Sequence, residues 1–482
     1  MNKPDRMSAL DAFFVYAEQD GVNHMHVGGF ALVEGTAPNA SEVVDALAGK
    51  LDRIPRYRQL IKDVPLHVGR PVWIDAPNFD ITQHVHRVDL PRPGHDALRA
   101  ELSAFISERL DRSMALWQLL IIGGVDDDQW SIAWKIHHSM VDGVSGTELL
   151  TILFDTEATP APSPAGPWSP RKGVSTPRVL GASIAELVGG LGRTAVGLRP
   201  ASVRKVGRVA KAYAGIGRQT IIPDRWSPLV GKIGTERSYD FCAVPFEDVK
   251  TIRTAFGGTV NDVVLTMVLH GFRTLLTSRG LQVSGKHLQV MVPVALRDRD
   301  EQGRPLGDGT METKASALMA KLPLDVDDPV ERLRIVRTRL AALKETSQAE
   351  ALTAVNEVTG LLPGTVTSVL LWSMSKRPQR SLHTTVTNVH GPSMLLYVLG
   401  RKIQLIGNYA PPFPMGARSS VTVYSYQGQL VFGVNADKKA LPDVDLITDG
   451  IQDAAAQLLR AAADKGTRPP KAPISKTTSS PG

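Results

Sequence analysis

The sequence predicts a two-lobed protein of mixed α and β structure. At 482 residues the chain is too long for one ordinary hydrophobic core. The stretch TPAPSPAGPWSP at residues 159–170 fits neither a helix nor a central strand, and it separates two regions in which strand-like and helical patterns alternate. Hydrophobic residues make up 43% of the chain and charged residues 21%, which is typical of a folded protein rather than a disordered one.

The first lobe is expected over residues 1–158. Residues 26–33 have the composition of a strand, and residues 97–110 place apolar side chains at helical spacing. Residues 116–125 and 130–136 are typical of two strands joined by an acidic turn. Two adjacent histidines follow directly after the second of these strands.

A linker is expected over residues 159–236, beginning with the Pro-rich stretch. At residues 187–223 it has no acidic residue, and arginines and lysines alternate with apolar residues at roughly helical spacing. Two interpretations stay open for this part. It is either a solvated helix packed across both lobes or an amphipathic segment that docks on anionic lipid.

The second lobe is expected over residues 237–464. Its expected elements are two helices (261–276 and 329–343) and three strands (287–293, 419–426 and 430–434). The tail at residues 465–482 is rich in Pro, Lys, Ser and Thr, and we expect it to be disordered.

Charge, cysteine content and apolar runs limit the classes of function. The net charge of +7 suits anionic lipid, nucleic acid or an anionic cofactor, but no nucleic-acid-binding motif accompanies it, so nucleic acid is not an expected partner. The single cysteine, Cys242, excludes an internal disulfide and a cysteine-based metal site. No signal peptide and no apolar run of about 18 residues is found, so we expect a cytoplasmic protein, either free or held at a membrane or lipid-droplet surface.

The segment HHSMVDG at residues 137–143 carries the clearest chemical signal. Side chains alternate along a strand, so His137 and His138 are expected to point in opposite directions, one toward a cleft and one into the framework. Asp142 can fix the loop or orient a ring, and Gly143 gives the backbone freedom to turn. A neutral imidazole suits the removal of a proton from an alcohol.

Three interpretations of these residues stay open at this point. His138 is a general base, or the histidines are buried core residues, or His138 and Asp142 bind a metal ion. The metal interpretation lacks an evident third ligand in the sequence. The residues by themselves do not decide among the three.

The motif H-H-x-x-x-D-G resembles the signature of the condensation and chloramphenicol-acetyltransferase-like superfamily. The wider pattern is similar to the bacterial wax ester synthase/diacylglycerol acyltransferase family, over about residues 7–460. The matching segments follow in the family's order: 8–13, 25–28, 53–58, 69–73, 79–80, 110–113, 116–117, 259–264, 293–297, 387–392 and 442–443.

The resemblance implies two chloramphenicol-acetyltransferase-like α/β lobes with an active-site channel between them. Acyl-CoA, as co-substrate, enters from one side and the acceptor alcohol from the other; no further cofactor and no metal is expected. His138 corresponds to the general base, and no covalent acyl-enzyme is needed. His137 is then a support of the loop, and Asp142 pairs with an arginine, for which Arg297 is the candidate.

Further motif residues are expected to have structural roles or, in one case, a contact with the reacting group. Asn261 and Asp262 are expected to cap a helix near the channel. Trp117 is expected to pack in the core. Asn388 is a candidate donor to the oxyanion that develops during acyl transfer.

The chain departs from the family pattern at three places. Ala115 stands where the family has the proline of Pro-Leu-Trp, Val230 where an asparagine is expected, and Glu312-Thr313 where a Gly-Asn pair is expected. These changes leave open which acceptor is used. Transfer to diacylglycerol, with fatty alcohols as further acceptors, is the leading prediction; the alternatives are a carrier-protein acyl donor and a non-catalytic lipid-binding or droplet-surface protein.

Overall fold

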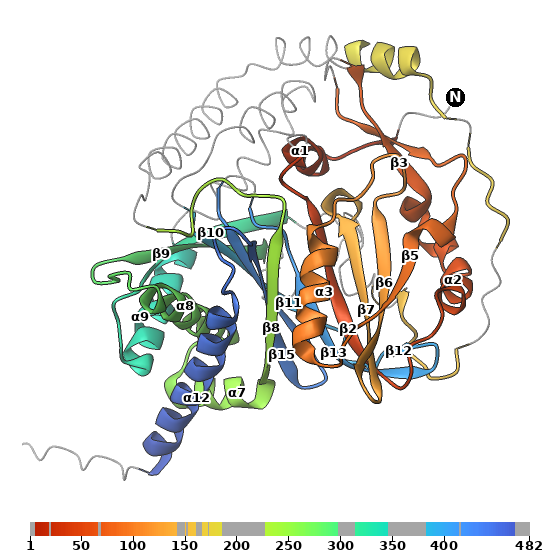
Figure 1. Cartoon of the computed structure of the whole chain (residues 1–482). Helices are drawn as coiled ribbons and strands as arrows, with labels where there is room; N and C mark the ends of the chain where they lie inside the picture. The colour runs from red at the N-terminus through yellow and green to blue at the C-terminus, as the bar shows by residue number, and fades with distance from the viewer. Residues whose placement is uncertain are drawn as a thin grey trace, which may run out of the picture.

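The computed structural model describes residues 5–18, 21–65, 69–141, 150, 153–160, 166–171, 173–185, 227–296, 314–345, 382–413 and 416–467. Within these ranges the strands form two six-stranded sheets and one three-stranded sheet. Each large sheet is the centre of one lobe, and the two lobes stand side by side (Figure 1). The mixed α/β fold with two lobes is confirmed.

The sheet of the N-terminal lobe has the strand order β12-β13-β2-β7-β6-β5. Its strands are β2 (His26–Glu34), β5 (Val85–Asp89), β6 (Trp117–Asp126), β7 (Gln129–His137), β12 (Tyr397–Val398) and β13 (Arg401–Tyr409). The strands predicted in this lobe are confirmed as β2, β6 and β7. The other elements are α1 (Ala9–Ala17), α2 (Ala40–Ala48), α3 (His95–Ser107), the small sheet of β1 (Asp5–Arg6), β4 (Val72–Asp75) and β3 (Gln59–Lys62), and the 3-10 turns η2 (Leu51–Arg53), η3 (Pro55–Arg58), η5 (Ile81–His84) and η6 (His138–Met140).

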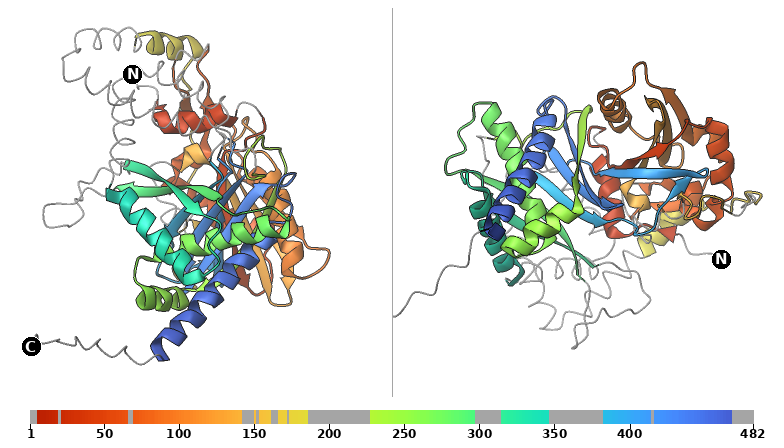
Figure 2. Two further views of the ribbon diagram at one scale, coloured as in Figure 1. Left: turned by 90° about the vertical axis from the view of Figure 1, so that its left-hand side faces the viewer. Right: turned by 90° about the horizontal axis from the view of Figure 1, so that it is seen from below.

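Two strands of this sheet come from the far end of the chain. β13 runs antiparallel to β2, with Leu405 opposite Leu32 and Tyr409 opposite Gly28. The right-hand view of Figure 2 shows this blue segment reaching in among the red and orange elements. The N-terminal lobe is therefore completed by a segment that the sequence assigned to the second lobe.

The sheet of the C-terminal lobe has the order β10-β9-β11-β14-β15-β8. Its strands are β8 (Arg237–Pro245), β9 (His287–Leu296), β10 (Lys314–Pro323), β11 (Thr384–His390), β14 (Ser419–Tyr426) and β15 (Gln429–Asp437). The helices α7 (Phe246–Phe256), α8 (Val260–Ser278), α9 (Pro329–Glu345) and α12 (Asp445–Thr467) gather on one side of this sheet (Figure 1). The helices and strands predicted in this lobe are confirmed. Among the described residues of the whole chain, no helix combines the length and apolarity that crossing a membrane requires.

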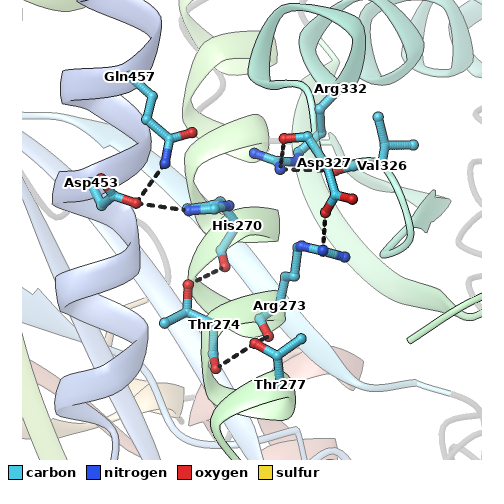
Figure 3. A network of polar contacts seen from close by, with 9 residues as sticks. All are labelled: His270, Arg273, Thr274, Thr277, Val326, Asp327, Arg332, Asp453 and Gln457. Carbon is cyan, nitrogen blue, oxygen red and sulfur yellow. Dashed lines mark hydrogen bonds and ion pairs between the residues drawn. The ribbon is translucent and has the colours of Figure 1, made fainter. Parts of the chain in front are cut away.

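Helices α8 and α12 approach closely and are joined by polar contacts at their edge. A Cβ added to Gly450 would lie 2.7 Å from the Cα of Gly271, so the two glycines let the helices touch. Beside this crossing, Nε2 of His270 lies 3.1 Å from a carboxylate oxygen of Asp453, which also accepts a hydrogen bond from Gln457 (Figure 3). Burial lowers the pKa of His270, so this histidine is a neutral interhelical contact at neutral pH.

Helix α3 lies against the N-terminal sheet, and side chains of that sheet satisfy the last carbonyls of the helix. Nζ of Lys135 donates to the carbonyl of Phe105 at 3.1 Å, and a ring nitrogen of His26 lies 2.8 Å from the carbonyl of Ile106. The apolar pattern of the sequence continues beyond the end of α3, but the helix stops where these groups meet its carbonyls.

Candidate active site

The adjacent histidines lie where β7 ends, and backbone hydrogen bonds hold this end from both sides. The N–H of His137 donates to the carbonyl of Leu116 at 2.9 Å, and the N–H of His138 donates to the carbonyl of Met25 at 2.8 Å. The chain then enters the turn η6, whose last residue, Met140, is buried in the core of the N-terminal lobe. The turn that carries His138 is therefore anchored before and after the ring.

Both ring nitrogens of His137 are engaged within the protein. The backbone N–H of Ser139 donates to Nδ1 at 3.2 Å, and Oγ of Ser139 lies 2.7 Å from the same nitrogen. Because Nδ1 is an acceptor, the ring proton is assigned to Nε2, which lies 3.5 Å from Oε2 of Glu18. The side chain of His137 is 1% exposed, so this ring belongs to the framework.

Glu18, the residue directly after α1, places a buried carboxylate behind the histidines. The carboxylate also accepts the N–H of Met25 at 3.3 Å and lies 3.9 Å from the guanidinium of Arg109. Burial by itself would raise the pKa of Glu18, but the hydrogen bond of His137, with Arg109 and the N–H of Met25, outweighs it and lowers the pKa to about 2. A negative charge therefore stands behind His137 at neutral pH.

The ring of His138 stacks on the ring of Phe14. The two centroids are 3.8 Å apart and the planes meet at 22°. His138 is half-buried, in contrast to the fully buried His137. This difference agrees with the expectation that one ring is held in the framework and the other is accessible. The cause of the difference is not strand alternation, because His138 begins a 3-10 turn and is no longer part of β7.

Of the remaining motif residues, the structure describes Trp117 but not the three that were expected to frame His138. Asp142, Gly143 and Arg297 lie outside the described residues, and so does the expected pairing of Asp142 with Arg297. Trp117 is 1% exposed and its indole N–H donates to the carbonyl of Tyr57 at 2.8 Å, which confirms its packing in the core.

The expected cap of α8 is present, with one change. The N-cap residue is Thr259, and the carboxylate of Asp262 accepts the N–H of Thr259 at 2.7 Å in a reciprocal capping box. Asn261 lies inside the first turn rather than at the cap, because the helix begins one residue earlier than the sequence predicts.

Asn388 lies half-buried on β11, in register with Val423 of β14. Its neighbour two residues back, Val386, belongs to the core of the C-terminal lobe, whereas Val389 packs against the cluster that contains Met140. Alternation along β11 therefore puts Asn388 on the face of Val386, away from that cluster. Its role toward an oxyanion stays a prediction.

The sequence alone does not identify Phe14 and Glu18, two of the side chains that contact the histidine rings. The available signal was a carboxylate directly after the apolar run FFVYA, four residues past an aromatic ring. Of the departures from the family pattern, Ala115 is buried and Val230 bridges to Ala417, whereas residues 312–313 lie outside the described ranges.

Solved structures share this two-lobed fold. A wax ester synthase/diacylglycerol acyltransferase from Marinobacter aquaeolei VT8 matches with a TM-score of 0.68 at 23% identity, covering 95% of this chain and 100% of that chain. The first condensation domain of the calcium-dependent antibiotic synthetase matches with a TM-score of 0.56 at 15% identity, over 96% and 98% of the two chains. The starter condensation domain of rhizomide synthetase, solved with C8-CoA and Leu-SNAC, matches with a TM-score of 0.53 at 14% identity, covering 96% of this chain and 95% of that chain. The fold is that of the condensation-domain class.

Sequence comparisons identify the family within this class. The model of the wax ester synthase/diacylglycerol acyltransferase catalytic domain matches residues 7–264, and that of the family's C-terminal domain matches residues 313–458. A Mycobacterium tuberculosis H37Rv protein named a diacylglycerol O-acyltransferase is 31% identical over 467 residues, covering 94% of this chain and 96% of its own. A second relative so named in that strain is 30% identical over 462 residues, covering 95% and 92%. The chain belongs to the wax ester synthase/diacylglycerol acyltransferase family and is an acyltransferase.

Proposed function

We propose that this chain transfers a long-chain acyl group from acyl-CoA to the hydroxyl of diacylglycerol, and to long-chain alcohols as further acceptors, with His138 as the general base. The observation that carries the assignment is the difference between the two histidines. The side chain of His137 is 1% exposed, whereas His138 is half-buried and rests by one ring face on Phe14. Of the pair, His138 is the ring with access to a substrate.

The reaction requires one proton removal and one proton return. His138 takes the hydroxyl proton as the alcohol oxygen forms its bond to the thioester carbonyl carbon. The carbon–sulfur bond then breaks, and His138 returns the proton to the departing CoA sulfur. The base ends the cycle neutral, and no covalent acyl-enzyme is formed.

The comparisons support the identity of both substrates. The two mycobacterial relatives are named for transfer to diacylglycerol, and the family name adds wax ester synthesis. A condensation domain of the same fold was solved with C8-CoA, which supports a CoA thioester as the donor.

One assay tests the proposal directly. The purified protein is incubated with oleoyl-CoA and either dioleoylglycerol or hexadecanol, CoA release is followed with a thiol reagent, and the ester is identified by mass spectrometry. We expect triacylglycerol from the first pair and a smaller yield of wax ester from the second. His138→Ala is expected to lower kcat by about 10²–10⁴-fold. Undiminished turnover in His138→Ala, or no CoA release with any alcohol, contradicts the proposal.

We also propose that the lipid substrates are met at a membrane or droplet surface. The basic segment that suggests this lies at residues 187–223, outside the described ranges. Flotation with vesicles containing anionic lipid is expected to carry the protein upward, and replacing the arginines and lysines of this segment by glutamine is expected to abolish flotation. Equal flotation of both proteins contradicts the surface role of this segment.

A further inference from the structure

Helix α1 and its C-cap residue, Glu18, each place one side chain against a histidine ring. Phe14 and Glu18 are four residues apart, which puts them one above the other on the same face of the helix. The Phe14 ring covers His138, and the Glu18 carboxylate meets His137. The backbone N–H of Glu18 donates to the carbonyl of Phe14, so the same helical turn sets the spacing of the two contacts.

Helix α1 is itself firmly held. At its start, the N–H of Asp11 donates to Oγ of Ser8 at 3.1 Å, and the hydroxyl of Ser8 donates to the Asp11 carboxylate at 2.8 Å. Phe13 and Tyr16 are buried on either side of Phe14. A helix fixed at its cap and along its length provides a support that does not move with the loop.

The Glu18 carboxylate reaches the turn of His138 by two routes. Oε2 faces Nε2 of His137, whose other ring nitrogen accepts the N–H of Ser139 and so closes the turn. Oε1 accepts the N–H of Met25, whose carbonyl in turn accepts the N–H of His138. One buried carboxylate thus fixes the residues on both sides of the His138 backbone.

We propose that Glu18 and Phe14 are positioning residues for acyl transfer. Glu18 keeps the His137 proton on Nε2, so that Nδ1 stays an acceptor and the turn under His138 stays closed. Phe14 holds the plane of the His138 ring at the angle from which its nitrogen meets the substrate hydroxyl. The proposal rests on the proposed role of His138 as the base. A misplacement of about 1 Å at such a group can lower the rate by about 10²-fold, so the two contacts are expected to matter for turnover.

The Phe14 contact is tested by a pair of substitutions. Phe14→Leu keeps an apolar side chain but removes the ring face, whereas Phe14→Tyr keeps the ring. We expect kcat to fall about tenfold in Phe14→Leu with KM within about twofold, and to stay near wild type in Phe14→Tyr. Phe13→Leu is the matched control, since Phe13 is buried next to Phe14 on the same helix. Wild-type kcat in Phe14→Leu, or an equal fall in Phe13→Leu, overturns this part.

The Glu18 contact is tested by Glu18→Gln, which keeps the shape and removes the charge. We expect kcat to fall about 10- to 100-fold with KM little changed. Asp11→Asn is the control, because Asp11 is a buried carboxylate of the same helix that bonds to Ser8. It is expected to lower the melting temperature and leave kcat near wild type. Full kcat in Glu18→Gln, while His138→Ala is inactive, overturns the positioning role alone; an active His138→Ala overturns the proposed function.

A measurement on the unmodified protein makes the proposal independent of the folding of any variant. Nitrogen-15 NMR of the histidine-labelled protein distinguishes the two neutral tautomers. We expect the ring nitrogens of His137, assigned in the wild-type protein through their connection to the His137 backbone, to report a proton on Nε2. A proton on Nδ1 of His137 in the wild-type protein overturns the proposal even if the variants fail to fold.

Discussion

The hydroxyl of Ser107 accepts the backbone N–H of Arg237 at 2.7 Å, which joins the end of α3 to the outer edge of β8. One helical turn earlier, the hydroxyl of Ser103 accepts the N–H of Tyr239 at 3.0 Å. Four residues of helix advance about 6 Å and two residues of strand about 6.6 Å, so the two serines meet alternate amides of β8. Helix α3 therefore covers the edge of one sheet while its end is held by the other, and it ties the two lobes together.

Ser107→Ala is expected to weaken this junction. Because the substitution removes the acceptor of the buried N–H of Arg237, the free energy of unfolding is expected to fall by about 1–3 kcal/mol. Urea denaturation measures the loss, and hydrogen exchange is expected to accelerate at Arg237. Ser284→Ala, in an exposed turn, is the control and is expected to change stability by less than about 0.5 kcal/mol. Equal stability of the two variants contradicts the junction.

The only cysteine of the chain, Cys242, is expected to be silent in the CoA-release assay. It is buried on β8, and burial raises the pKa of its thiol above the ordinary value, with the charges of Asp240 and Asp449 adding to the effect. Because the thiolate is the reactive form, an aromatic disulfide reagent is expected to leave the native protein unmodified. One thiol per chain is expected after denaturation, and none in Cys242→Ala. Rapid labelling of the native protein contradicts this burial.

Glu18 is expected to make stability depend on acid. Its pKa of about 2 lies below the ordinary 4.5, so the carboxylate stabilises the fold above its unfolded-state pKa, and this contribution is lost as the pH falls toward 2. The lowered pKa corresponds to at most roughly 3 kcal/mol of stability. Denaturation of wild type and Glu18→Gln is expected to show a difference in unfolding free energy at pH 7 that narrows at about pH 3. A difference that stays constant with pH contradicts the assignment.

Gly271→Ala is expected to disturb the crossing of α8 and α12. An added Cβ would lie 2.4 Å from the carbonyl oxygen of Ile447, so the helices must move apart, at a cost of about 1–3 kcal/mol. Gly181→Ala is the control. Gly181 is helical and an added Cβ there has nothing within 4 Å, so this change is expected to stabilise by about 0.5–1 kcal/mol. Thermal melting that moves in the same direction for both variants contradicts the close approach.

Local patterns in the sequence predicted the elements well. Residues 419–426 were predicted as a strand and form β14, and the periodicity of residues 261–276 predicted most of α8. Such elements are predictable because the repeat of a helix or strand places apolar side chains on one face and leaves its period in the sequence. The ends of the elements are less predictable from the sequence. In α3, for example, side chains from distant strands satisfy the last carbonyls of the helix.

The sequence by itself determined the mixed α/β lobes and, through the order of its motifs, the family and the histidine pair. Only the tertiary structure decided that β13 completes the N-terminal sheet and that Phe14 and Glu18 support His138 and His137. These contacts join segments far apart along the chain. They leave no period in the sequence, because they depend on which strands pair and in what register, and that is settled only when the whole chain packs.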